Sequence, residues 1–246
     1  MQNQTLLSVN VNKIATLRNS RGKDIPNLLE TTLKIIEYGA QGITVHPRPD
    51  ERHIRKSDVY ELSKAISVEF NIEGYPSEDY LQLIEAVRPA QATLVPDPPD
   101  ALTSNAGWQL DTHLQLLKTV TKRIQATGAK CSLFMDPKDS NENTISQLKL
   151  IGCDRIELYT EAFADDYSTP KRDNTTQSYY QLAEAAHKNG IHINAGHDLN
   201  LDNLNYLVKS IPFLAEVSIG HALMTDALEW GLKETLKKYL ACLKQV

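Results

Sequence analysis

Imidazole, guanidinium and carboxylate groups gather in the stretch Gly42–Gly74. The stretch opens with a short β-branched apolar run that predicts a buried strand, and His46 and Arg48 follow it. A second such run carries Asn71 and Glu73. Because side chains alternate along a strand, His46 shares a face with Arg48, and Asn71 shares one with Glu73.

Acid–base chemistry is what such a grouping supports. Histidine titrates near neutral pH, and burial raises the proton affinity of a glutamate, so His46 and Glu73 could exchange protons with a ligand. Each residue also has an ordinary interpretation: a surface His46, a solvated Arg48, or a Glu73 paired with a core arginine. Their position at the ends of neighbouring strands favours the functional interpretation.

The strands that would position these groups are predicted by eight apolar, β-branched runs. The distance between successive runs suffices for a helix and two loops. The predicted strands are Leu6–Val11, Gly42–His46, Glu69–Gly74, Ala92–Asp97, Lys130–Asp136, Arg155–Tyr159, His192–Gly196 and Glu216–His221.

Helices are predicted between the strands, because apolar residues recur there every three or four positions. Ser57 and Ser77 are expected as N-caps, and Gly39, Gly128 and Gly190 as helix stops. The predicted helices are Asn27–Tyr38, Ser57–Ile66, Ser77–Val87, Thr112–Ala126, Asn143–Leu150, Thr176–Lys188, Leu201–Ile211 and Ala222–Leu243.

This alternation predicts an α/β fold, a (β/α)₈ TIM barrel that forms a single domain over residues 1–246. A doubly wound open sheet is the alternative, but it usually has a glycine-rich turn after its first strand, and this chain has none there. The loops after strands 1, 4 and 6 are long (12–26, 98–108 and 160–175), with room for extra short helices.

In such a barrel the loops that follow the strands form the active face. Four of the seven histidines fall at that face by this reading. The polar residues expected there are Asn10, Asn12, Arg18, Arg21, His46, Arg48, His53, Glu73, Thr103, Glu157, Asn194, His197 and His221.

Two anion sites are also predicted. Gly220 and His221 lead directly into a helix, whose first backbone N–H groups can bind phosphate. Arg21, Arg48 and His53 would supply cationic groups for a second phosphate. Two such sites suggest two phosphorylated substrates or one bisphosphate.

Composition narrows the classes of function. The net charge of -5 argues against a nucleic-acid partner. No apolar stretch is long enough for a membrane span, and the N-terminus does not resemble a signal peptide. Three scattered cysteines without a CxxC motif are typical of a reduced, cytoplasmic protein.

Two other functions fit the same residues. Histidine and glutamate also bind zinc, which allows a metal-dependent hydrolase, although the chain lacks an HExxH motif. A binder of phosphorylated ligands without catalysis is the second alternative.

Several motifs together resemble the pyridoxine 5′-phosphate synthase (PdxJ) family over essentially the whole chain: SVNVNKIATLRNSRG, GITVHPRPDERHI, FNIEGYP, TLVPD, RIELYTE, NAGHDLNLDNL and EVSIGHAL. The resemblance implies condensation of 3-amino-2-oxopropyl phosphate with 1-deoxy-D-xylulose 5-phosphate, which yields pyridoxine 5′-phosphate, phosphate and water in bacterial vitamin B6 synthesis. It also implies a homo-octamer that uses neither cofactor nor metal.

The resemblance further implies a role for each matching residue. The proton acceptors would be His46 and Glu73, the proton donor His197, and the transition-state stabiliser Glu157. The aminoketone phosphate would be held by Asn10, Arg21, Asp198, Gly220 and His221. The deoxyxylulose phosphate would be held by Arg48, His53, Thr103, Asn12 and Lys13. The chain departs from the family pattern where Asn12-Lys13 replaces Asp-His and Asp198 replaces glycine.

Overall fold

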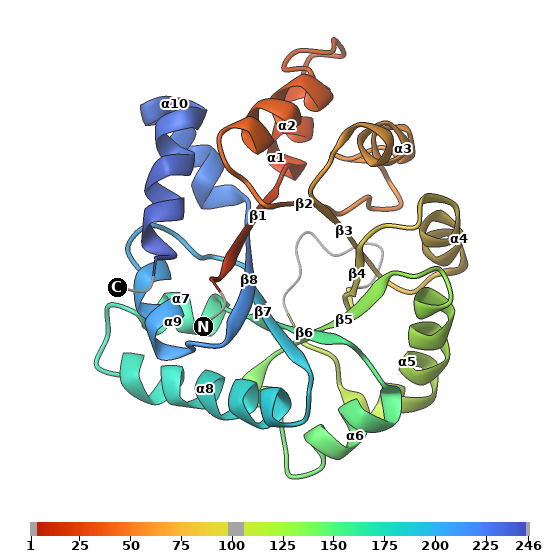
Figure 1. Ribbon diagram of the computed structural model, residues 1–246, viewed down its shortest axis with the longest axis vertical. Coiled ribbons are helices and arrows are strands. Elements are labelled where there is room, and N and C mark those ends of the chain that lie inside the picture. Colours follow the sequence, from red (N-terminus) through yellow and green to blue (C-terminus); the bar gives the residue numbers. More distant parts are fainter. Residues whose placement is uncertain (1–3, 98–105, 245–246) are drawn as a thin grey trace.

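A closed barrel of parallel strands forms the centre of the computed structural model, which describes residues 4–97 and 106–244 (Figure 1). Each strand pairs with its neighbours in the sequence, and the first pairs with the last, so the predicted (β/α)₈ barrel is confirmed and the open sheet is excluded. The strands are β1 (Leu6–Asn10), β2 (Gly42–Val45), β3 (Glu69–Gly74), β4 (Gln91–Leu94), β5 (Lys130–Met135), β6 (Arg155–Tyr159), β7 (His192–Gly196) and β8 (Leu214–Ile219).

Helices surround the barrel (Figure 1). An additional helix, α1, lies between β1 and α2, and another, α7, lies between β6 and α8. The loop after β4 includes residues 98–105, outside the described part of the chain. The helices are α1 (Asn12–Asn19), α2 (Leu28–Glu37), α3 (Lys56–Ala65), α4 (Glu78–Val87), α5 (Leu110–Gln125), α6 (Thr144–Ile151), α7 (Glu161–Asp166), α8 (Arg172–Lys188), α9 (Leu204–Ser210) and α10 (His221–Cys242), with a 3₁₀ turn η1 (Pro137–Asp139).

Local signals explain where the helices begin. Ser77 caps α4, because its hydroxyl accepts the backbone N–H of Tyr80 at 3.2 Å. The N-cap prediction for Ser57 is wrong, since the N-cap lies two residues earlier and Ser57 is inside α3. Arg55 occupies that cap, and its backbone N–H donates to the Asp58 carboxylate at 2.8 Å. The Asp58 carboxylate, three residues after the cap, therefore accepts a hydrogen bond at the start of α3, in place of the serine hydroxyl that the sequence predicted.

The barrel interior is polar, whereas the strand faces toward the helices are apolar. Ile43, Ile72 and Ile156 belong to the buried cluster between strands and helices. Inside the barrel, the hydroxyls of Ser8 and Thr44 lie 2.8 Å apart. Aliphatic side chains usually fill this space, so a hydrogen-bonded interior is a distinctive property of the chain.

A charged network occupies the amino-terminal end of the barrel. Arg155 donates to Glu69 at 2.5 Å and also to Gln91. Asn194 donates to Gln91 and to Glu216, each at 3.2 Å. The expectation that Asn194 lies at the active face is therefore wrong, because its mid-strand position places the amide deep in the interior.

Candidate active site

His46 and Glu73 meet at the carboxyl ends of neighbouring strands. The two strands pair in parallel, with Val45 opposite Ile72, so the residue after each lies at the same end of the barrel. The His46 Nδ1 lies 3.6 Å from the Glu73 Oε2, and the side chains are only 9% and 14% exposed. The two side chains predicted to meet are thus adjacent and largely shielded from water.

Burial keeps both groups uncharged at neutral pH. It raises the pKa of Glu73 to about 8, with the Asp97 carboxylate adding to the effect and Arg48 opposing it. It also lowers the pKa of His46 well below the usual value, and the positive charge of Arg48 acts in the same direction. A neutral imidazole and a protonated carboxyl can each change charge when a ligand arrives.

Glu157 joins this pair from β6, on another side of the interior. Burial raises its pKa well above the usual value, the charge of Glu73 adds to this, and the Thr93 hydroxyl opposes it. A β-carbon on Gly196 would lie only 2.3 Å from the Oε1 of Glu157, which is too close for two atoms that are not bonded. Glycine at position 196 is therefore what allows this carboxyl to occupy the site.

Arg48 is held in place by a carboxylate that the sequence analysis did not single out. Its Nη2 lies 2.8 Å from the Asp97 Oδ2, and both side chains are buried. Asp97 follows β4 by three residues, on the strand side that already carries Thr93 and Val95. The period of two along this run was the signal that could have identified it.

His53 is a neutral hydrogen-bond donor rather than a cation. Burial, with Arg48 and Arg52 nearby, lowers its pKa to about 4, so the expectation of a cationic ring is wrong. The backbone N–H of Ile54 donates to its Nδ1 at 2.9 Å. The neutral ring therefore carries its proton on Nε2, where it can donate to a ligand oxygen.

A buried ion pair fixes the loop that carries His53. The guanidinium of Arg18 binds both oxygens of Asp58, at 2.7 and 2.8 Å. The same guanidinium donates to the carbonyl of His53 at 3.2 Å, and the Asn19 amide donates to it at 2.8 Å. Arg18 therefore lies among the segments that follow β1 and β2, at the face where it was expected, and holds α1 against the loop that follows β2.

Asn10 and Asn12 connect the end of β1 to His46. The side-chain oxygen Oδ1 of Asn10 accepts a hydrogen bond from the backbone N–H of Asn12 at 3.0 Å. The side-chain oxygen Oδ1 of Asn12 accepts one from the backbone N–H of His46, also at 3.0 Å. An asparagine oxygen thus supplies an acceptor that aspartate would also supply. Lys13, the next residue, is exposed on α1.

The ends of β7 and β8 contribute the remaining candidates. His197 and Asp198 contact each other, with Nδ1 and Oδ2 2.6 Å apart. Gly220 precedes the first residue of α10, His221, so the predicted transition from turn to helix is confirmed. A β-carbon on Gly220 would lie 3.1 Å from the Asn10 Cβ, which places this helix start beside the end of β1.

One candidate, Arg21, is not brought into this group. Arg21 is exposed beyond the end of α1. Thr103 lies outside the described residues.

In the ranges 4–97 and 106–244, no cluster of three or more His, Cys, Asp or Glu side chains could hold a metal ion. None of the described helices is long and apolar enough to cross a membrane.

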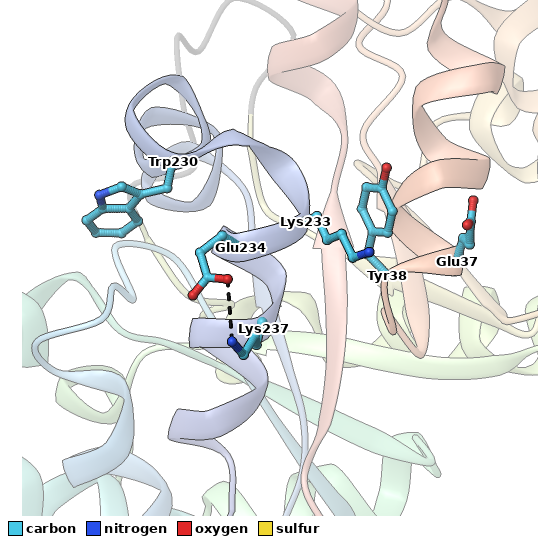
Figure 2. A pocket seen from close by; sticks show the side chains of 6 residues that line it. All are labelled: Glu37, Tyr38, Trp230, Lys233, Glu234 and Lys237. Carbon is cyan, nitrogen blue, oxygen red and sulfur yellow. Dashed lines mark ion pairs between the residues drawn. The ribbon is translucent and has the colours of Figure 1, made fainter.

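A hollow of about 510 Å³ lies away from the strand ends, between the end of α2 and the second half of α10 (Figure 2). Acidic and basic side chains both line this hollow, and an ion pair joins Glu234 to Lys237 at 3.5 Å. None of the candidate residues lines it. The lining side chains are Glu37, Tyr38, Trp230, Lys233, Glu234 and Lys237.

Solved structures share the fold at low sequence identity. Tryptophan synthase from M. tuberculosis aligns over 98% of this chain and 94% of its own, with a TM-score of 0.65 and 12% identity. A 3-hexulose-6-phosphate synthase aligns over 98% of this chain and 100% of its own, with a TM-score of 0.63 and 13% identity. These similarities support the barrel alone.

Sequence comparison is more specific. The family model described as pyridoxal phosphate biosynthesis protein PdxJ matches residues 7–245. A pyridoxine 5′-phosphate synthase from Porphyromonas gingivalis is 54% identical, over 96% of this chain and 97% of the relative. One from Christiangramia forsetii is 50% identical, over 98% and 100%. The chain belongs to the PdxJ family of vitamin B6 biosynthesis enzymes.

Proposed function

We propose that this protein is a pyridoxine 5′-phosphate synthase that condenses 3-amino-2-oxopropyl phosphate with 1-deoxy-D-xylulose 5-phosphate. The observation that carries the proposal is the buried group of His46, Glu73 and Glu157 in a member of this family. The reaction joins an amine to a ketone, removes a carbon-bound proton, and expels phosphate and water. It therefore needs several proton transfers around one intermediate.

His46 and Glu73 are suited to the steps that remove protons. The substrate amine must lose a proton before it attacks a ketone, and the neutral His46 ring can accept it. Glu73 begins largely protonated and becomes a base after it gives up its proton, which a cationic amine nearby would favour. The protonated carboxyl of Glu157 can donate a hydrogen bond to oxygen as charge develops there.

Phosphate binding divides between two regions. Arg48 and the Nε2–H of His53 would hold the deoxyxylulose phosphate, with Thr103, Asn12 and Lys13 completing the set. The aminoketone phosphate would lie against the start of α10, at Gly220 and His221. Asn10 and Arg21 would complete that second set, and His197 would donate a proton, with Asp198 beside it as its carboxylate partner. Holding both substrates in reactive geometry supplies much of the rate enhancement.

Assembly and location are part of the same proposal. The family resemblance suggests a homo-octamer, which light scattering of the purified protein would test. The substrates are charged phosphate esters made inside cells, so we propose a cytoplasmic location. Every step named is a proton transfer, an addition or an elimination, so the proposed reaction requires no redox cofactor.

The experiment is a reaction of purified, chelator-treated protein with both substrates. Pyridoxine 5′-phosphate is followed by absorbance, and inorganic phosphate by its release. Equimolar formation of the two supports the proposal. Activity that is lost to the chelator and restored by zinc would indicate a metal-dependent hydrolase. Binding of both substrates without turnover would indicate a non-catalytic binder.

A further inference from the structure

The turn after β7 holds two consecutive residues in the left-handed backbone region. His197 has a φ of 86° and Asp198 a φ of 55°. Residues other than glycine seldom adopt such angles, and aspartate tolerates them better than most. Strained backbone of this kind persists only where surrounding contacts impose it, and it is often found at functional sites.

Two buried side chains impose this turn. The Thr160 hydroxyl donates to the carbonyl of Gly196 at 2.9 Å and also reaches the carbonyl of His197. The Asn203 amide donates to the carbonyl of Asp198 at 3.2 Å. Thr160, directly after β6, and Asn203, the residue before α9, are almost fully buried, so both ends of the turn are held by buried side chains.

The turn brings the Asp198 carboxylate onto the imidazole of its own neighbour. The His197 Nδ1 lies 2.6 Å from the Asp198 Oδ2. The ring also packs edge-on against Tyr159, with ring centroids 4.9 Å apart and planes at 76°. A carboxylate on Nδ1 places a proton there, which leaves Nε2 as the ring atom that can exchange a proton with a ligand.

The carboxylate is suited to stabilise a protonated ring. The hydrogen bond from His197 lowers the pKa of Asp198 below its usual value, so Asp198 stays ionised at neutral pH. Its negative charge balances the imidazolium that exists before His197 donates a proton. It also means that the carboxylate faces the ring rather than a phosphate, which it would repel.

We propose that Asp198 is a positioning residue that fixes the ring orientation and the Nδ1–H tautomer of His197, so that Nε2 transfers the proton. This inference rests on the proposed function, in which His197 is the proton donor. In the step, Nε2–H gives its proton to a departing hydroxyl, which leaves as water. The neutral ring then retains the Nδ1–H bond to Asp198.

The first test needs no turnover. Full-length protein with ¹⁵N-labelled histidine is studied by NMR without substrate, and His197→Gln identifies the signal. We expect the neutral ring to be the Nδ1–H tautomer in the wild type. The tautomers should become mixed in Asp198→Asn and Asp198→Gly, while Asp202→Asn, at an exposed aspartate nearby, leaves the signal unchanged. An Nε2–H tautomer in the wild type would overturn the proposal.

The second test separates positioning from substrate binding. We expect Asp198→Asn to lower kcat about 10- to 100-fold, the usual effect of losing a partner that orients a functional histidine, while KM for the aminoketone phosphate stays nearly constant. A raised KM with unchanged kcat would show a direct binding role instead, and unchanged kinetics would show no role. If the wild type forms no pyridoxine 5′-phosphate, the proposed function fails, while the NMR result still decides whether Asp198 fixes the tautomer.

Discussion

Replacing Glu73 by glutamine should stabilise the protein at alkaline pH while it abolishes turnover. In the folded protein this carboxyl keeps its proton up to about pH 8, whereas a free glutamic acid releases it near 4.5. Between these values the folded state holds one more proton than the unfolded state. Stability from this group is therefore fully present below pH 4.5 and is lost as pH rises toward 8.

The size of the effect follows from that interval. At about 1.4 kcal/mol for each pH unit, the difference between 4.5 and about 8 sets a ceiling of about 5 kcal/mol. The side chain is 14% exposed, and an imidazole lies 3.6 Å away, so solvent and a neighbour both reduce the cost of ionisation. We expect about half the ceiling, or about 2–3 kcal/mol.

Urea unfolding at two pH values measures this difference. At about pH 5 the wild type and Glu73→Gln should have similar free energies of unfolding, because both side chains are neutral. At about pH 8.5 the variant should be the more stable by about 2–3 kcal/mol. A stability difference that is the same at both pH values would refute the reasoning, since the carboxyl would then not be protonated in the folded protein.

Glu216 provides a matched control. Burial also raises its pKa to about 8, but it lies in the amino-terminal half of the barrel, where it accepts a hydrogen bond from Asn194. Glu216→Gln should give a similar gain at alkaline pH and keep the turnover of the wild type. If both variants lost activity equally, Glu73 would have no special role in the chemistry.

Two further predictions concern buried contacts. Asp58→Asn should lower the free energy of unfolding by about 3–5 kcal/mol, because it leaves the buried guanidinium of Arg18 without its counter-charge; urea denaturation measures this, and a loss below about 1 kcal/mol would contradict it. Gly196→Ala should strongly lower turnover with the fold retained by circular dichroism, because the added methyl would lie 2.3 Å from the Glu157 Oε1 and would displace that carboxyl. Wild-type turnover in this variant would show that catalysis does not depend on the present position of the Glu157 carboxyl.

The fold was predictable because its signals are local and repeated. Each strand is a short β-branched run, and each of Gly39, Gly128 and Gly190 takes the positive φ of a helix stop, as expected. Strand ends were less certain: β2 stops at Val45, so His46 belongs to the following loop. The end of β2 is set by its hydrogen bonds to the neighbouring strands, and these cannot be predicted from the sequence of β2 alone.

The site was predictable in its position but only partly in its chemistry. Alternation along strands placed His46 with Arg48 and Asn71 with Glu73, and the parallel pairing of β2 with β3 brought His46 and Glu73 together. Alternation after β4 could have indicated that Asp97 faces the site, but its pairing with Arg48, like that of Asp58 with Arg18, joins distant segments that no local pattern connects. The neutral state of His53 depends on burial, which residue type alone does not reveal.

The polar interior links the protonation states of the site to the architecture. An aliphatic interior would make an ionised Glu73 very costly, whereas the Ser8, Thr44 and Asn71 side chains offer hydrogen bonds to one another a layer below it. The carboxyls of Glu73 and Glu157 nevertheless stay protonated because both are buried; the charge of Asp97 further raises the pKa of Glu73, and the charge of Glu73 further raises that of Glu157. Under the proposed function, a cationic substrate amine would reverse that balance and couple binding to proton release. A site arranged in this way should take up the amine and discharge a proton in the same event, which calorimetry in buffers of different ionisation enthalpy would detect.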